Sequence, residues 1–188
     1  MKLILPKTYI DPADIRQPIF FLAGPDRGGG NWQEQCCVEL AKHLPEFSIV
    51  VPCWRWTKED KLFRYRVSGV EDRFYSRTAW EHYYLNFVAE KSREHQGCII
   101  FWLPAESKEQ PRSDGQVYAK NTYGELGGWR RSFALDPSIH LAVGAEPNFP
   151  GLDDIQENFN LDTGKNFHIY STLEETAKDA VQWVLTTG

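Results

Sequence analysis

The chain has 188 residues, of which 41% are hydrophobic and 14% aromatic, a composition that excludes a disordered protein and fits one domain with a substantial core. The net charge is −5, and no long basic run occurs, which argues against binding to duplex nucleic acid. No apolar stretch reaches the length of a membrane span, and the N-terminal apolar run is too short for a signal peptide. We therefore expect a cytoplasmic protein with no membrane partner.

The first part of the chain predicts a strand followed by a helix. After a lead-in segment, residues 1–17, the continuously apolar residues 19–23 predict a buried strand that runs into a glycine-rich loop. Asn31 is the expected N-cap of the helix, and Glu34 stands three residues later, at the spacing of a capping box. Pro45 is expected to end this helix.

The middle of the chain continues the alternation. Residues 47–51 predict a second strand, and residues 53–72 are irregular and rich in aromatic and charged side chains. A helix is expected from about 76 to 94, with its apolar side chains at helical spacing. The apolar residues 98–103 predict a third strand, and a long polar loop over residues 104–121 follows it.

The last part predicts two more strands and two more helices. We expect a helix over residues 125–133, a strand over residues 139–143 and a loop-rich segment over residues 145–166. Residues 167–170 predict a fifth strand, and Thr172 or the serine before it is the expected N-cap of the final helix.

Strands that alternate with helices and are apolar throughout are typical of a parallel sheet covered on both faces. The expected fold is one flavodoxin-like or Rossmann-like α/β domain over residues 1–188. Its five-stranded parallel sheet is expected to have the order 2-1-3-4-5, counted along the predicted strands.

The four cysteines, Cys36, Cys37, Cys53 and Cys98, lack C-x-x-C spacing, and the histidines show no H-x-x-x-H or similar spacing. We therefore predict no metal site. The thiols are interpreted as reduced residues of the core.

Glu125 is the best candidate for chemistry. It follows the long loop after the third predicted strand, and Gly124, Gly127 and Gly128 surround it. Ligands of open α/β sheets bind beyond the carboxyl ends of the strands, where glycines allow a close approach. A carboxylate there can attack an electrophilic sugar carbon. The alternative is an acid in the first turn of a helix, favoured by the helix dipole.

Two other segments carry weaker signals. The loop over residues 24–30 precedes a helix N-terminus, which favours an anion, and Arg27 could hydrogen-bond to a 5′-phosphate. The loop matches neither G-x-G-x-x-G nor a Walker motif, and a plain turn is the alternative. Glu81 could point into a cleft and hydrogen-bond a sugar hydroxyl, or it could be an ordinary exposed helix acid.

Together these segments resemble the nucleoside 2-deoxyribosyltransferase-like family, over about residues 19–145. The matching segments, in chain order, are Phe21–Pro25, Trp32 with Gln33, Pro52 with Arg55, Trp80 with Glu81, Ile99–Pro104, Glu125–Gly127 and Val143 with Gly144. The resemblance implies a Rossmann-like domain that cleaves the N-glycosidic bond of deoxyribonucleosides or their monophosphates without a cofactor. It also allows for a homo-oligomer with sites near the subunit boundaries.

The resemblance implies that Glu125 is the nucleophile, and we expect Glu81 to support the covalent step. Glu125 would form a covalent glycosyl intermediate, which water or a second base would then attack, so hydrolase and transferase activities both stay open. The expected substrate-binding residues are Gly24, Pro25, Asp26, Arg27, Gly28, Trp32, Arg55, Trp80, Gln96 and Gly124.

One position departs from the family pattern. The family usually has an aspartate at the start of the strand before the catalytic loop, where it helps to protonate or hold the base, and here Gln96 stands near that place. His95 or Asp114 could supply the proton instead. Two other functions therefore remain open: a nucleotide-binding sensor module without turnover, and a TIR-like domain that cleaves NAD.

Overall fold

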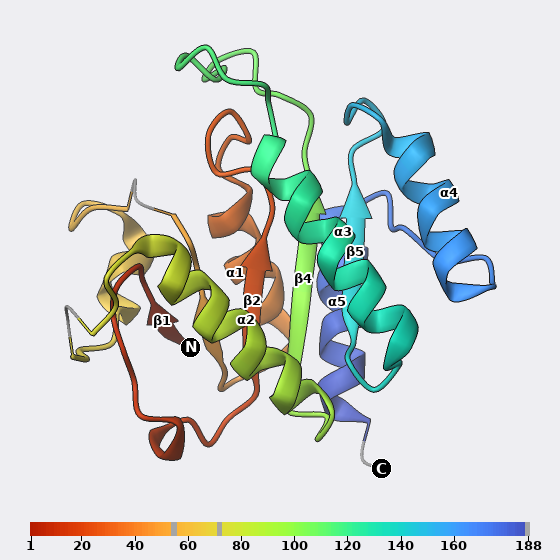
Figure 1. Cartoon of the computed structure of the whole chain (residues 1–188). Coiled ribbons are helices and arrows are strands. Elements are labelled where there is room, and N and C mark those ends of the chain that lie inside the picture. Colours follow the sequence, from red (N-terminus) through yellow and green to blue (C-terminus); the bar gives the residue numbers. More distant parts are fainter. Residues whose placement is uncertain (54–55, 71–72, 187–188) are drawn as a thin grey trace.

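A five-stranded parallel sheet forms the centre of the computed structural model, which describes residues 1–53, 56–70 and 73–186 (Figure 1). Its strands lie in the order β1-β3-β2-β4-β5. Their bounds are Lys2–Ile4 for β1, Ile19–Ala23 for β2, Ser48–Val50 for β3, Gly97–Leu103 for β4 and Leu141–Ala145 for β5. Strands β2, β4 and β5 are buried along their whole length, as their continuous apolar sequences predict.

The predicted α/β class and the relative order of four predicted strands are confirmed, but the fifth strand differs. The strand that the sequence did not predict is β1. It lies within the expected lead-in segment and pairs with β3 at the edge of the sheet. Residues 167–170 contribute only a bridge between Tyr170 and Gly144. The reason is local: the Phe167 amide donates to the side chain of Asn160, so this backbone is bound by the preceding helix.

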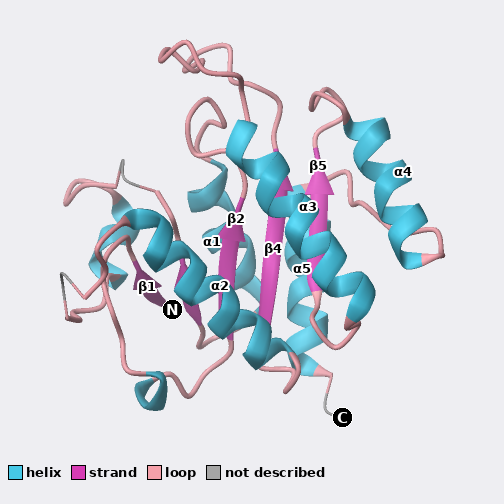
Figure 2. Ribbon diagram, in the orientation of Figure 1, coloured by secondary structure: helices cyan, strands magenta, loops and turns pink. Residues whose placement is uncertain are grey.

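Helices cover both faces of the sheet (Figure 2). Helices α2 and α3 lie on one face and α1 and α5 on the other, while α4 packs beside α3. Their bounds are Trp32–His43 for α1, Arg77–Ser92 for α2, Lys120–Leu135 for α3, Leu152–Thr163 for α4 and Leu173–Leu185 for α5. Among the described residues, no helix combines the length and apolar character that a membrane crossing requires.

Helix α4 replaces a segment that was expected to be loop-rich. Gly151 and Gly164 flank it in left-handed conformation, which is why the sequence around it resembles a loop. Within the helix, Ile155 and Phe159 are four residues apart and both buried. This one-sided burial is sufficient to hold a helix whose other residues are mostly polar.

The helix starts agree with the sequence in part. Ser76 caps α2 by accepting a hydrogen bond from the Ala79 amide, as the predicted start requires. Asn31 precedes α1, but its side chain does not cap the helix. Its side-chain nitrogen Nδ2 instead donates to the Glu34 carboxylate. Helix α3 begins five residues earlier than expected, so Glu125 lies in its second turn, where the helix dipole alone does not explain a carboxylate.

The path of the chain creates a crevice between β2 and β4. From β2 the chain passes through α1 to β3 on one side, and α2 then carries it back across to β4 on the other side. The connections from β2 and from β4 therefore run to opposite sides of the sheet, and ligands of open α/β sheets bind at such a point. All four cysteines are buried, and burial raises the pKa of the Cys36 thiol.

Gly24, directly after β2, lies so close to the backbone of Trp102 that no side chain fits at this position. Its φ is +151°, and an added Cβ would lie 2.2 Å from the Trp102 carbonyl oxygen. We expect Gly24→Ala to lower the free energy of unfolding by about 2–4 kcal/mol, measured by urea denaturation.

Gly128→Ala is the matched control, because a Cβ there meets nothing within 4 Å and the residue lies inside α3. Alanine should stabilise this helix by about 0.5–1 kcal/mol. Equal unfolding midpoints for the two variants would contradict the close packing at Gly24.

Candidate active site

A cavity of about 280 Å³ lies at the carboxyl ends of β2 and β3, beside the N-terminal turns of α2 and α3. Six charged side chains reach it, three acidic and three basic. Its lining consists of Phe21, Ala23, Gly24, Pro25, Asp26, Arg27, Pro52, Arg77, Thr78, Glu81, Arg112, Ala119, Asn121, Thr122 and Glu125.

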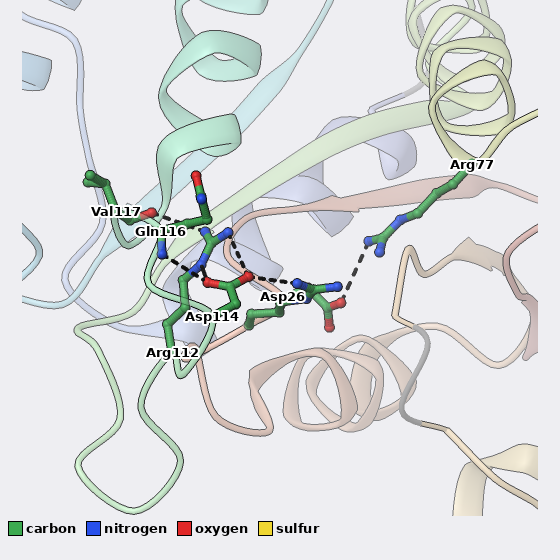
Figure 3. A network of polar contacts seen from close by, with 7 residues as sticks. Asp26, Arg77, Arg112, Asp114, Gln116 and Val117 are labelled. Atoms are coloured by element: carbon green, nitrogen blue, oxygen red, sulfur yellow. Dashed lines mark hydrogen bonds and ion pairs between the residues drawn. The ribbon is translucent and has the colours of Figure 1, made fainter.

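Arg77, in the first turn of α2, joins three parts of this wall. Its Nε lies 2.6 Å from Glu81 Oε1, one helical turn later. Its Nη2 lies 3.6 Å from Asp26 Oδ2 in the loop after β2, a contact drawn in Figure 3. The same nitrogen donates to the Pro52 carbonyl after β3. One guanidinium group therefore fixes α2 relative to the loops of two strands.

Glu125 reaches the cavity from α3. Burial is the main cause that raises its pKa to about 7, and the negative charge of Glu81 raises it further, while the charge of Arg77 lowers it. A carboxylate with such a pKa is a stronger base and nucleophile than an exposed glutamate, yet it is still substantially ionised at neutral pH. Perturbed pKa values in clefts are typical of functional sites.

The loop after β2 is held in shape by its neighbours. The indole nitrogen of Trp32 donates to the Pro25 carbonyl at 2.8 Å, and the ring is buried. The Ser107 amide donates to the Gly28 carbonyl at 2.7 Å, which joins this loop to the loop after β4. Trp32 and Gly28 thus shape the wall without lining the cavity.

Six of the residues expected from the sequence line the cavity together: Gly24, Pro25, Asp26, Arg27, Glu81 and Glu125. Arg55 lies outside the described residues. The exposed-acid alternative for Glu81 is not supported, because its side chain is 15% exposed and ion-paired.

Three expected residues lie elsewhere. Trp80 is fully buried in the core and donates to the Thr8 carbonyl at 2.8 Å, because its position on α2 faces the sheet rather than the cavity. Gln96 immediately precedes β4 and so lies at the N-terminal ends of the strands, whereas the cavity lies at their carboxyl ends. There its carbonyl accepts a hydrogen bond from the Ile19 amide. Gly124 opens instead into a groove between α2 and α3, which Glu125 also lines.

The two substitutes considered for the missing proton donor are also displaced. His95 lies beside Gln96, where its ring packs against Trp183 at a centroid distance of 4.1 Å. Asp114 lies on the loop after β4, but hydrogen bonding from Arg112 holds the pKa of its carboxyl well below the usual range. Asp114 therefore stays ionised and does not serve as a general acid.

Arg77 and Arg112 are the main site residues that the sequence analysis did not single out. Arg77 carried a usable signal, because a cation four residues from Glu81 on a helix predicts an ion pair. Arg112 lies in a polar loop without periodicity, and no local pattern marks it. Its position depends on how the loop folds back over the cavity.

Among the described residues, no cluster of three or more His, Cys, Asp or Glu side chains is placed to hold a metal ion. Comparison with protein-family models gives no match to this chain, and no curated protein matches it significantly either.

The raised pKa of Glu125 predicts a pH-dependent stability. Between its ordinary pKa of 4.5 and about 7, the folded state keeps a proton on Glu125 that the unfolded state has lost. Stability contributed by that proton is lost as the pH rises through this window. We expect Glu125→Gln to reduce the decrease in unfolding free energy between pH 5 and pH 8 by on the order of 2–3 kcal/mol.

The control is Glu90→Gln, which removes an exposed acid from α2. Urea denaturation at several pH values checks the difference between the two variants. Identical pH profiles for wild type and Glu125→Gln would show that Glu125 is not desolvated in the folded protein.

Proposed function

We propose that this protein cleaves or transfers the N-glycosidic bond of a deoxyribonucleoside or its monophosphate through a covalent intermediate on Glu125. The observation that carries the proposal is the position of the Glu125 carboxylate in one cavity with Glu81 and Arg77, where burial raises the pKa of Glu125. The order of motifs shared with the nucleoside 2-deoxyribosyltransferase-like family supports it independently.

In the first step, an ionised oxygen of Glu125 attacks C1′ of the sugar. The C1′–N bond breaks, and its electron pair leaves with the base, which takes up a proton from solvent. In the second step, water or another base attacks C1′ and loses a proton to solvent, and the C1′–O bond to Glu125 breaks to release the carboxylate. Two displacements at one carbon retain the anomeric configuration, with oxocarbenium-like character in each transition state.

Glu81 and Arg77 have supporting roles in this scheme. The Glu81 charge raises the pKa of Glu125, and the Arg77 charge moderates that effect. Arg77 also holds the Glu81 carboxylate in one orientation at 2.6 Å. Glu81 can then accept a hydrogen bond from a sugar hydroxyl while Glu125 performs the covalent step.

The loop after β2 supplies the expected contact for the sugar or its 5′ end. Gly24, Pro25, Asp26 and Arg27 follow one another along the cavity wall. The Arg27 side chain is 66% exposed, so its guanidinium group can turn toward a ligand. A 5′-phosphate would receive charge-assisted hydrogen bonds from it.

A nucleotide-binding module without turnover is the second candidate function. The locations of Gln96 and Asp114 favour it, because neither residue provides a proton to a departing base in the described structure. The two functions differ in one measurable respect. A binding module shows a ligand-dependent rise in melting temperature without release of free base.

The direct test is incubation with a panel of deoxyribonucleosides and their monophosphates, with and without an acceptor base, followed by chromatography. We expect base release by wild type and a loss on the order of a thousandfold in Glu125→Ala, corresponding to about 4 kcal/mol of transition-state stabilisation. The variant should remain folded. Near-wild-type base release by Glu125→Ala would remove this residue from the mechanism.

The pH–rate profile tests the division of roles between the two glutamates. Since the nucleophile must be ionised, kcat/KM should rise with pH through about 7 in wild type. Glu81→Gln removes the negative charge that raises the Glu125 pKa, so the rise should shift to lower pH. Its maximal rate should decrease about tenfold to a hundredfold, less than for Glu125→Ala.

An unshifted profile in Glu81→Gln would mean that the two carboxylates are not coupled. An equal loss of maximal rate in Glu81→Gln and Glu125→Ala would mean that the roles are assigned incorrectly.

A further inference from the structure

The loop between β4 and α3 carries a carboxylate that contacts two of the arginines lining the cavity. Asp114 Oδ2 lies 2.7 Å from Arg27 Nη1 and 3.1 Å from Arg112 Nη2, and Asp114 Oδ1 lies 2.6 Å from Arg112 Nε. The Gln116 amide also donates to Oδ1, at 3.2 Å. Figure 3 shows the Arg112 guanidinium group and Gln116 beside the Asp114 carboxylate.

The two arginines are held to different degrees. Arg112 uses all three of its nitrogens within its own loop, since its Nη1 donates to the Val117 carbonyl at 3.0 Å, and its side chain is 16% exposed. Arg27 comes from the loop after β2, and its side chain is 66% exposed. Its hydrogen bond to Asp114 uses Nη1 of the guanidinium group. Arg112 therefore fixes Asp114, whereas Arg27 is able to leave it.

The charges of the cavity make Arg27 important for an anionic ligand. Asp26, Glu81 and Glu125 line the cavity, and Arg77 is already paired with two of them. A phosphate group therefore enters beside several carboxylates and depends on Arg27 for compensation. Carboxylate and phosphate oxygens use the same guanidinium donors, so Asp114 and a phosphate are competitors for one cation.

We propose that Asp114 determines phosphate selectivity in this site by competing with the anionic group of the ligand for Arg27. The identification of that group as a 5′-phosphate rests on the proposed function. When the phosphate binds, Arg27 turns from Asp114 into the cavity, while Arg112 keeps the Asp114 carboxylate in place. Because the phosphate must displace the Asp114 carboxylate from Arg27, Asp114 lowers the affinity for phosphorylated relative to neutral ligands.

The test is the variant Asp114→Asn, which keeps the shape of the side chain and one oxygen acceptor but removes the charge. Binding of 2-deoxyribose 5-phosphate and of neutral 2-deoxyribose is measured by calorimetry at constant ionic strength. We expect the variant to bind the sugar phosphate roughly two- to fivefold more tightly than wild type, the range of an exposed ion pair. The affinity for 2-deoxyribose should not change.

Asp162→Asn is the matched control, because Asp162 also faces two arginines and its side-chain exposure of 26% is close to the 29% of Asp114. It pairs with Arg130 and Arg131 on α3, and none of these three residues lines the cavity. The control changes the net charge equally and should leave the affinity for sugar phosphate at the wild-type value.

Arg27→Ala completes a double-mutant cycle. It should weaken binding of the sugar phosphate, and adding Asp114→Asn should then produce no gain. Unchanged or weaker sugar-phosphate binding in Asp114→Asn, including no binding by either protein, overturns the proposal. A gain that persists without Arg27 also overturns it. Because these probes contain no base and need no turnover, failure of base release in the panel assay is separate from failure here.

Discussion

The site depends on one cation held between acids. Arg77 contacts Glu81 on its own helix, Asp26 in the loop after β2 and the Pro52 carbonyl after β3. It thereby joins the helix on one face of the sheet to the ends of two strands, and its charge also acts on Glu125. Without it, partly buried carboxylates would lose their compensating charge, a change that is strongly destabilising for buried pairs.

The fold supplies the rest of the arrangement through topology. The chain leaves β2 toward β3 and leaves β4 toward β5, on opposite sides, and the first turns of α2 and α3 lie beside the cavity at this end of the sheet. Gly24 allows β2 to pass close to the Trp102 carbonyl at this point. Two helices can then bring carboxylates from different parts of the chain to one cavity, where the charge of Glu81 raises the pKa of Glu125.

The sequence was sufficient for the α/β sheet and for the place of Glu125 at the cavity, because continuous apolar strands and a glycine-flanked acid after a strand are local signals. It was insufficient for β1, whose three residues show no period, and for α4, whose flanking glycines resemble a loop. Trp80 and Gln96 were expected at the site because of their place in the motif order. The helix phase of α2 puts Trp80 in the core, and the direction of β4 puts Gln96 at the end of the sheet opposite the cavity. Arg112 could not be found, because its position depends on the fold of a long loop.

The measurement that tests the central claim most directly is trapping of the covalent intermediate. A 2′-fluoroarabinosyl nucleoside slows both steps, because fluorine destabilises the oxocarbenium-like transition states, and the glycosyl-enzyme accumulates if the second step slows more. Intact-mass spectrometry should show one added fluorosugar, and peptide mapping should place it on Glu125. An adduct on any other residue, or inverted configuration in the product of the unmodified substrate, would contradict the role of Glu125 as nucleophile.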